Sequence, residues 1–249
     1  INNFQKYKLF NNLLVDLKID DKNFKEKLNK LEIKRELISN GIISPQNRIY
    51  INQLEVHNLI QSMIKNFFYL NNIKRKYLKV NSNKIEFYKC NNQMIELIHT
   101  NINFVKKSEI WIKLLFIASF EKDIDKALII YRKNNLYCTE TLLAPTPLKA
   151  SQLMEEYFTI YKNSIKNCLP LPPESSFKYI SASIRNKDSI KAFIDEWVGN
   201  KNFTLGERDK PEMQICYGYE KDPYFFLNNK NFRELSLKLY KPLIESSFK

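Results

Sequence analysis

Residues 84–101 read KIEFYKCNNQMIELIHTN. Apolar and polar side chains alternate in each half of this stretch, around Glu86 and around Glu96. Alternation with a period of two is typical of a strand that buries one face, and the two asparagines between the halves suit a tight turn. The stretch therefore predicts a β-hairpin with strands at 84–90 and 93–100.

The sequence on either side of this hairpin predicts helices and a second hairpin. Residues 110–118 fit either a buried strand or a buried helix by periodicity, and the length of the surrounding segment favours a helix. Thr146-Pro147 is a good helix start, because Thr is a capping residue and Pro in the first turn gives up no hydrogen bond. The predicted elements are helices in the first third, at 104–119, from 146 to the proline-rich 169–173, at 189–198 and through 232–243, a hairpin at 127–131 and 136–141, and an irregular stretch at 206–229.

These elements predict an α/β (α+β) chain of two parts. A helical lead-in occupies 1–70, and an α/β domain at 71–249 is expected to form one compact unit. Hydrophobic residues make up 44% of the chain and aromatic residues 13%, which is enough to build a core and argues against disorder. The chain begins at Ile1, without an initiator Met and inside a helical pattern, so we expect it to be a segment of a longer polypeptide.

The charge of the chain raises the question of a nucleic-acid partner. The formal net charge is +13, and basic surfaces favour contact with phosphates. The alternative is that a lysine-rich and asparagine-rich composition spreads this charge over the whole surface without a function. Residues 61–90 hold the densest cluster, with seven cations against one acid, Glu86. The candidate DNA-contacting residues are Lys74, Arg75, Lys76 and Lys79, with Tyr69 and Tyr77 placed for stacking, and the alternative is a solvated junction.

Several kinds of site are absent from the sequence. The chain has only four glycines, none in a phosphate-binding loop or a dinucleotide fingerprint. His57 and His99 are far apart, and the paired acids Glu155-Glu156 and Asp195-Glu196 are expected on solvated faces. No apolar run approaches the roughly 20 residues that span a bilayer. We therefore expect no cofactor, no membrane contact and a cytoplasmic location.

The four cysteines, Cys90, Cys138, Cys168 and Cys216, lie far apart in the sequence. No close pair of the kind used by zinc sites and redox motifs is present. Four cysteines in 249 residues are also too few for a disulfide scaffold. We expect all four to be reduced core residues.

Short motifs, taken in order, resemble the C-terminal domain of the RecC family, the gamma subunit of exodeoxyribonuclease V. FQKYKL at 4–9 and LISNGIIS at 37–44 look like the family's entry motifs LxRYQL and LxxxGLLP, except that Lys6 replaces Arg and Ser44 precedes the Pro. The other similar stretches are EIWIKLL at 109–115, LPLPPES at 169–175, FIDEWVGN at 193–200, LGE at 205–207 and YKPL at 240–243. Their order across nearly the whole chain makes the resemblance specific.

This resemblance implies a PD-(D/E)xK nuclease-like (restriction-endonuclease-like) fold. Active members carry one Asp in the first strand of a hairpin and an Asp-Tyr-Lys-like triplet in the second, because carboxylates must hold the Mg²⁺ that activates water. Here the first position falls near Phe87 and the triplet falls on Leu97 to His99, so neither the acids nor the Lys is present. Glu86 and Glu96 lie one residue away, and such an offset points a strand side chain to the opposite face. The resemblance therefore implies a domain that has lost its catalytic residues and binds no metal.

The implied role is in assembly and DNA handling. RecC-type subunits bind RecB-type and RecD-type subunits, channel the separated strands and contribute to recognition of the recombination hotspot. The expected partners are therefore those two subunits and DNA, in double-strand break repair and recombination. Two alternatives remain open: an active Mg²⁺-dependent nuclease of the RecB type, and a basic DNA-binding module with no role in assembly.

Overall fold

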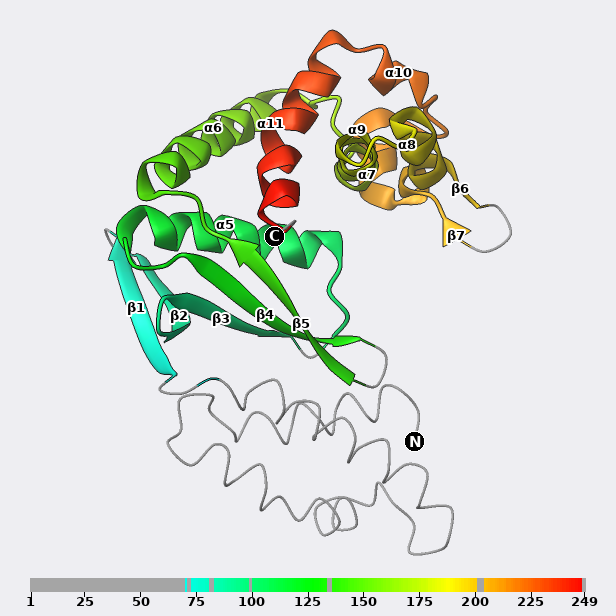
Figure 1. The fold of residues 1–249 in the computed structure, drawn as a ribbon. Coiled ribbons are helices and arrows are strands. Elements are labelled where there is room, and N and C mark those ends of the chain that lie inside the picture. Colours follow the sequence, from blue (N-terminus) through cyan, green and yellow to red (C-terminus); the bar gives the residue numbers. More distant parts are fainter. Residues whose placement is uncertain are drawn as a thin grey trace, which may run out of the picture. The chain divides into compact units, whose positions relative to one another are not determined.

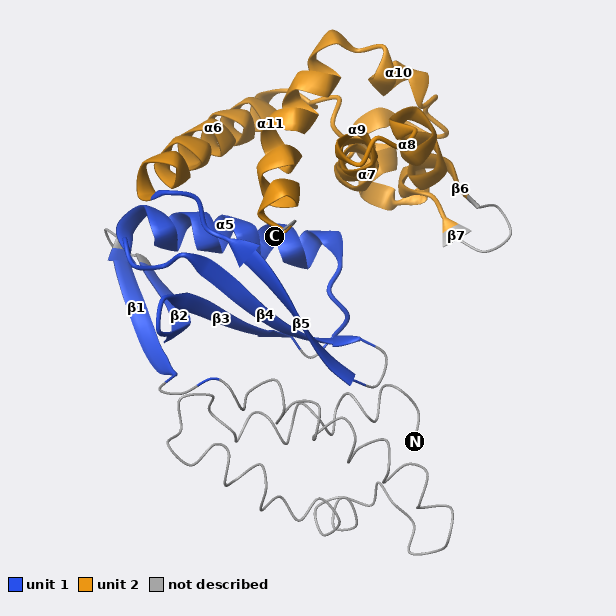
Figure 2. Cartoon of the chain, in the orientation of Figure 1, with its two compact units in different colours: residues 1–146 blue, residues 147–249 orange. Residues whose placement is uncertain are grey.

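The computed structural model describes residues 70, 73–80, 83–98, 100–133, 136–200 and 204–247 (Figure 1). The expected helical lead-in at 1–70 lies outside the described residues except for its last residue, and so do Tyr69 and His99. The chain divides into two compact units, Ile1–Thr146 and Pro147–Lys249 (Figure 2). The stretch 71–249, expected to be one unit, is thus divided at Pro147, and each unit is described by itself.

The described part of the first unit is a mixed five-stranded sheet with one helix. Its elements are β1 (Lys74–Val80), β2 (Asn83–Cys90), β3 (Gln93–Ile98), α5 (Phe104–Phe120), β4 (Lys126–Lys133) and β5 (Leu136–Leu143). The strands are ordered β1-β2-β3-β4-β5, and all neighbours are antiparallel except β3 and β4, which are parallel. Both predicted hairpins and the predicted helix are confirmed.

Helix α5 is the connection that the parallel pair requires. Two parallel strands cannot be joined by a tight turn, so the chain must cross over the sheet between them. The Asn103 side chain caps the start of α5 by accepting a 2.9 Å hydrogen bond from the Lys106 N–H. Figure 1 shows α5 lying along one face of the sheet. Its buried side chains are Ile110, Trp111, Leu114, Leu115, Ile117 and Ala118.

The second unit is mostly helical. Its elements are α6 (Pro147–Lys166), α7 (Pro173–Ile184), α8 (Ser189–Val198), β6 (Gly199–Asn200), β7 (Thr204–Leu205), η1 (Glu207–Asp209), α9 (Pro211–Tyr217), α10 (Tyr224–Leu227) and α11 (Lys230–Ser246). The predictions of α6, α8 and α11 are confirmed. The prediction of an irregular stretch at 206–229 is wrong, because short helices occupy much of it. Helices α7 and α9 both begin on a proline, which has no N–H to leave unbonded in the first turn.

An aromatic cluster forms a core in the second unit. Phe193, Trp197, Phe226 and Phe232 are at most 1% exposed. The Trp197 and Phe226 ring centroids are 4.8 Å apart, and the Trp197 indole N–H donates a 2.7 Å hydrogen bond to the Lys221 carbonyl. The cluster gathers residues from α8, α10 and α11, so it holds together segments that are distant in the sequence.

Gly206 is required by a close approach of two backbone segments. A Cβ atom at this position would lie 2.3 Å from the Trp197 carbonyl oxygen and 2.4 Å from the Val198 carbonyl carbon. Both neighbours are backbone atoms and cannot move aside as a side chain would. Gly206 therefore lets the segment before η1 pack directly against the end of α8.

No helix among the described residues is both long enough and apolar enough to cross a membrane.

Candidate functional site

The β2–β3 hairpin carries the positions at which the family resemblance implies catalytic residues. Its strands pair through Tyr88 with Ile95, Lys89 with Met94, and Cys90 with Gln93. Two residues join the strands, and Asn91 has a φ of 52°, the left-handed conformation that Asn tolerates and that tight hairpins need. The pairing fixes which side chains share a face.

The two implied catalytic positions do not share a face. Side chains alternate along a strand, and Lys89 pairs with Met94, so Phe87 and Glu96 lie on the same face as these two residues. Glu86 and Leu97 lie on the opposite face by the same rule. Glu86 is thus displaced from Phe87 as expected. In the second strand it is Glu96, and not Leu97, that shares the face of Phe87.

Glu96 lies on the face that α5 covers, here called the α5 face. The Glu96 carboxylate is bonded to the Lys113 ammonium, and the Glu140 carboxylate of β5 is bonded to the Lys107 ammonium. Both lysines come from α5. In the sheet register Ile129 of β4 lies between the two acids. The backbones of the two acids are therefore two strand spacings apart, roughly 10 Å, and each carboxylate is bonded to a different lysine.

These two ion pairs fasten α5 to the sheet. The four side chains are between 19% and 30% exposed, so the pairs are only partly screened by water. Phe87, on the same face, is 1% exposed and belongs to the core. Among the residues that the structure describes, no group of three or more His, Cys, Asp or Glu side chains could hold a metal ion.

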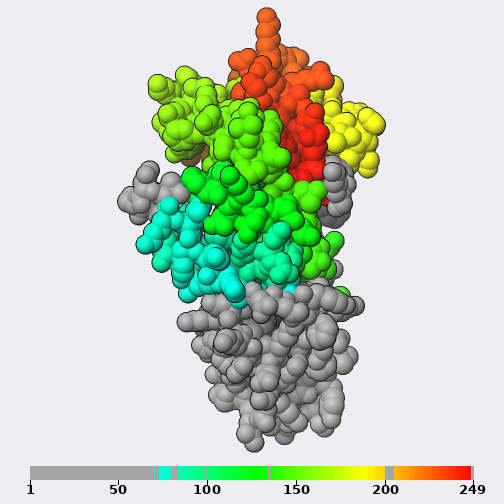
Figure 3. All heavy atoms as spheres, turned by 60° about the vertical axis from the view of Figure 1, so that its left-hand side comes forward, coloured from blue at the N-terminus to red at the C-terminus, as the bar shows by residue number. Residues whose placement is uncertain are grey.

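The predicted DNA-contacting residues form an exposed surface on β1. We call Lys74, Arg75, Lys76 and Lys79, with Lys84 of β2, the basic ribbon; all five are exposed. Strand β1 is the edge of the sheet and pairs only with β2 among the described strands. Alternation sends Lys74 and Lys76 to the α5 face, and Arg75 and Lys79 to the opposite face. In the space-filling view, the cyan atoms of this segment are part of the visible surface (Figure 3).

Tyr77 stands among the cations of the opposite face. Its ring is 43% exposed. The Lys84 ammonium is 3.6 Å and the Arg75 guanidinium 5.3 Å from the ring centroid, within the range of a cation–π interaction. Arg75 also makes a bidentate pair with Glu86, with both N···O distances 2.5 Å. This pair lowers the pKa of Glu86 and neutralises Arg75 locally. Lys74, Lys76, Lys79 and Lys84 make no ion pair with any acid in the described part of the chain.

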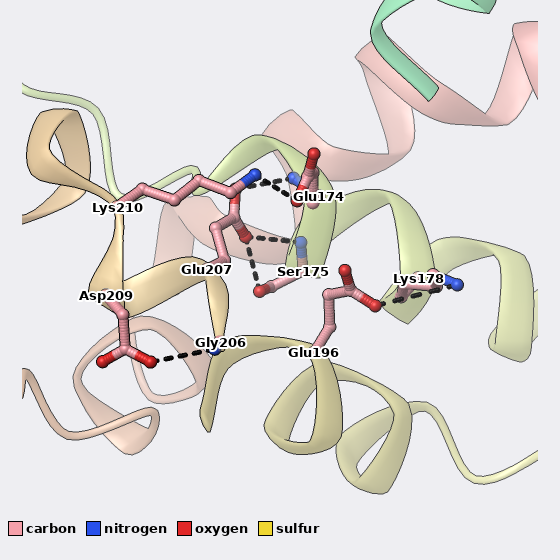
Figure 4. Close-up of polar contacts among 8 residues, drawn as sticks. All are labelled: Glu174, Ser175, Lys178, Glu196, Gly206, Glu207, Asp209 and Lys210. Carbon is pink, nitrogen blue, oxygen red and sulfur yellow. Dashed lines mark hydrogen bonds and ion pairs between the residues drawn. The ribbon is translucent and has the colours of Figure 1, made fainter. Parts of the chain in front are cut away.

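The most deeply buried acid of the described chain is Glu207, which sequence reasoning did not identify as important beyond its place in the LGE motif. Glu207 is 2% exposed. One carboxylate oxygen accepts a hydrogen bond from the Glu174 N–H (2.8 Å), and the other accepts from the Ser175 N–H (2.7 Å) and hydroxyl (2.6 Å) (Figure 4). These are free donors of the first turn of α7, where a negative charge is stabilised. Lys210 is bonded to the neighbouring Glu174 at 2.5 Å.

Both carboxylate oxygens of Glu207 already accept hydrogen bonds from groups of the same chain. The three hydrogen bonds favour the carboxylate, but burial acts more strongly and raises the pKa of Glu207. The site therefore joins η1 to the start of α7, and we assign it to folding. In the sequence, the only sign of this site is the LGE motif at 205–207, in which Glu207 follows Gly206.

The expectation that all four cysteines are core residues is partly wrong. Cys90 is buried and Cys138 is half-buried, whereas Cys168 and Cys216 are exposed. The fold brings these last two together, although they are 48 residues apart.

No protein-family model matches the chain, and no curated protein matches it either.

We expect Glu207→Gln to lower the free energy of unfolding by about 1–3 kcal/mol at pH 7, because its amide NH₂ cannot accept from the Ser175 N–H. The loss should be largest in acid. Since the folded pKa of Glu207 is raised, the native protein binds more protons, and the natural chain loses stability as the pH rises through that pKa. Urea unfolding followed by circular dichroism between pH 4 and pH 8 would measure both effects.

The matched control is Glu155→Gln, a change in an exposed acid in the middle of α6. It should leave the stability unchanged across this range. A deficit of Glu207→Gln that grows with rising pH would contradict the raised pKa.

Proposed function

We propose that this chain is the non-catalytic C-terminal domain of a RecC-type subunit of a RecBCD helicase–nuclease. In this role it contributes to contacts with RecD-type and RecB-type subunits and to the handling of DNA strands during double-strand break repair in the cytoplasm. The observation that carries the proposal is Phe87. At the position where the resemblance implies the first catalytic Asp, the chain has an aromatic side chain that is 1% exposed and belongs to the core.

The order of elements supports a nuclease-like origin for this unit. The resemblance implies a hairpin that carries the site, followed by a helix, and the chain has the β2–β3 hairpin followed by α5. Of the two acids near the implied site, only Glu96 shares a face with Phe87. Its charge is compensated by Lys113. Metal-assisted hydrolysis needs carboxylates that are free to hold the ion, so these contacts favour a domain without catalysis.

The basic ribbon supports a role in handling DNA. Its cations are exposed on the edge strand β1 and at the start of β2, and its four lysines make no ion pair within the described part of the chain. Lysines bind phosphates as point charges and carry little sequence information. Such a surface is suited to contacts with the phosphates of a nucleic acid, and less suited to recognition of its bases.

The proposal predicts that the chain with Mg²⁺ leaves linear DNA intact. We expect no degradation above background over hours, by gel electrophoresis, under conditions in which an active RecB-type nuclease domain digests the same DNA. Glu96→Gln and Glu86→Gln should change nothing. Degradation that either variant abolishes would establish the alternative, an active Mg²⁺-dependent nuclease, and would refute the proposal.

The assembly role predicts that the chain co-purifies with a RecD-type subunit. The measurement is a pull-down with the tagged chain, after circular dichroism has shown that the chain is folded. An unrelated basic protein of similar charge serves as the control for electrostatic retention. If the folded chain retains neither a RecD-type nor a RecB-type subunit, the assembly role is refuted. The remaining alternative is then a basic DNA-binding module with no role in assembly.

The DNA role predicts that Lys74→Ala, Lys76→Ala and Lys79→Ala together weaken binding and reduce the slope of log K against log salt by up to about three. Arg75 is left in place, because its removal would expose the Glu86 carboxylate to the phosphates. Fluorescence anisotropy with labelled DNA at several salt concentrations would measure the slope.

The matched control changes Lys187, Lys191 and Lys230, three exposed lysines of the second unit, to Ala. It removes the same charge and should leave the slope nearly unchanged. Equal effects of the two triple variants would show that net charge, and not the basic ribbon, governs binding.

A further inference from the structure

Cys168 and Cys216 lie side by side in the second unit. Cys168 follows α6, and Cys216 belongs to α9. The Cys168 Sγ donates a 3.4 Å hydrogen bond to the Cys216 carbonyl oxygen. Both side chains are exposed, so solutes can reach the pair. Cys90 and Cys138 differ from this pair, since neither is exposed.

The residues next to each cysteine hold this arrangement in place. The Tyr217 hydroxyl donates a 2.7 Å hydrogen bond to the Leu169 carbonyl and accepts one of 3.4 Å from the Leu171 N–H. The Tyr217 ring packs against Phe226 at 4.9 Å between centroids, and Phe226 is fully buried in the aromatic cluster. The segment after Cys168 is therefore tied to α9 immediately beside Cys216. Cys168 and Cys216 lie together because the backbone beside each of them is anchored.

We propose that Cys168 and Cys216 form a reversible disulfide by exchange with low-molecular-weight disulfides. The Cys168 thiol already contacts the backbone of Cys216, so the two side chains start close together, and a disulfide brings the sulfurs to a separation of about 2 Å. Their anchored backbones give each thiol a high effective concentration at the other. Cytosolic disulfides are usually transient and responsive to redox state, and two exposed neighbouring thiols fit that class better than a structural cross-link.

The exchange proceeds in two balanced steps. The Cys216 thiolate attacks one sulfur of the small disulfide, forms a mixed disulfide and releases one small thiolate. The Cys168 thiolate then attacks the Cys216 sulfur, forms the Cys168–Cys216 bond and releases the second small thiolate. The protein thiols give up two protons and two electrons, and the small disulfide is reduced to two thiols. We assign the first attack to Cys216 because the Cys168 thiol donates its proton in the hydrogen bond to the Cys216 carbonyl, which favours the protonated form of Cys168. Burial raises the pKa of Cys168 in the same direction.

The cross-link would tie the α6–α7 connection to α9. The loop that it closes contains α7, α8 and η1, and therefore includes the Glu207 site and two residues of the aromatic cluster, Phe193 and Trp197. A disulfide that closes a loop of this length reduces the conformational entropy of the unfolded chain more than that of the native chain. Oxidation is therefore expected to stabilise the second unit without rearranging it.

The test uses the full chain treated with oxidised glutathione in native buffer. We expect the loss of two free thiols per molecule and a mass decrease of two hydrogen atoms, with no glutathione retained. Peptide mapping without reductant should link the peptides that contain Cys168 and Cys216. The midpoint of thermal unfolding should rise by about 10 °C and return to its original value with dithiothreitol.

Single variants separate this pair from the other cysteines. Cys168→Ser and Cys216→Ser should each abolish the cross-link and leave a glutathione adduct on the remaining partner. Cys138→Ser should cross-link like the natural chain. A stable glutathione adduct on Cys216 of the natural chain, a cross-link at other cysteines, or no loss of thiols would each overturn the proposal.

Discussion

The parallel pairing of β3 with β4 constrains the rest of the first unit. Because these strands point in the same direction, the chain between them has to cross the sheet, and α5 is that crossing. The part of the sheet face beneath α5 then becomes largely interior, and the acids there need partners. Lys113 and Lys107 supply partners for Glu96 and Glu140. These two ion pairs fasten the helix to the sheet.

The second unit has a different organisation, in which the motif residues serve packing. Trp197 belongs to the aromatic cluster, and Gly206 permits close contact with the end of α8. Glu207 accepts hydrogen bonds from the backbone N–H groups in the first turn of α7. These roles need a specific residue at a specific place, which explains why such elements stand out in the sequence. Motif residues of this kind stabilise the fold of the second unit. The candidate binding residues of the chain are instead exposed ones.

Much of the fold could be predicted from the sequence, because the signals were local. Alternation predicted both hairpins, and apolar spacing predicted α5, α6, α8 and α11. Helix α7 was missed because the proline-rich 169–173 was taken only as the end of the preceding helix, and α9 lies in the stretch predicted to be irregular. Each of these helices has a proline at its first position. The sheet face on which the Glu96 side chain lies depends on the register between β2 and β3. The contact between Cys168 and Cys216 depends on the packing of segments that are 48 residues apart. Neither has a local signal.

The candidate DNA surface follows from the position of β1 at the edge of the sheet. A run of cations in a central strand would place alternate charges beneath α5, and each of those buried charges would require a partner. At the edge, the same run exposes lysines on both faces, and only Arg75 is neutralised, by Glu86. Lysines that point to both sides of one strand cannot present a flat surface to a groove, but they can follow a single phosphate backbone. The geometry of the basic ribbon therefore favours sequence-independent contact with one strand at a time.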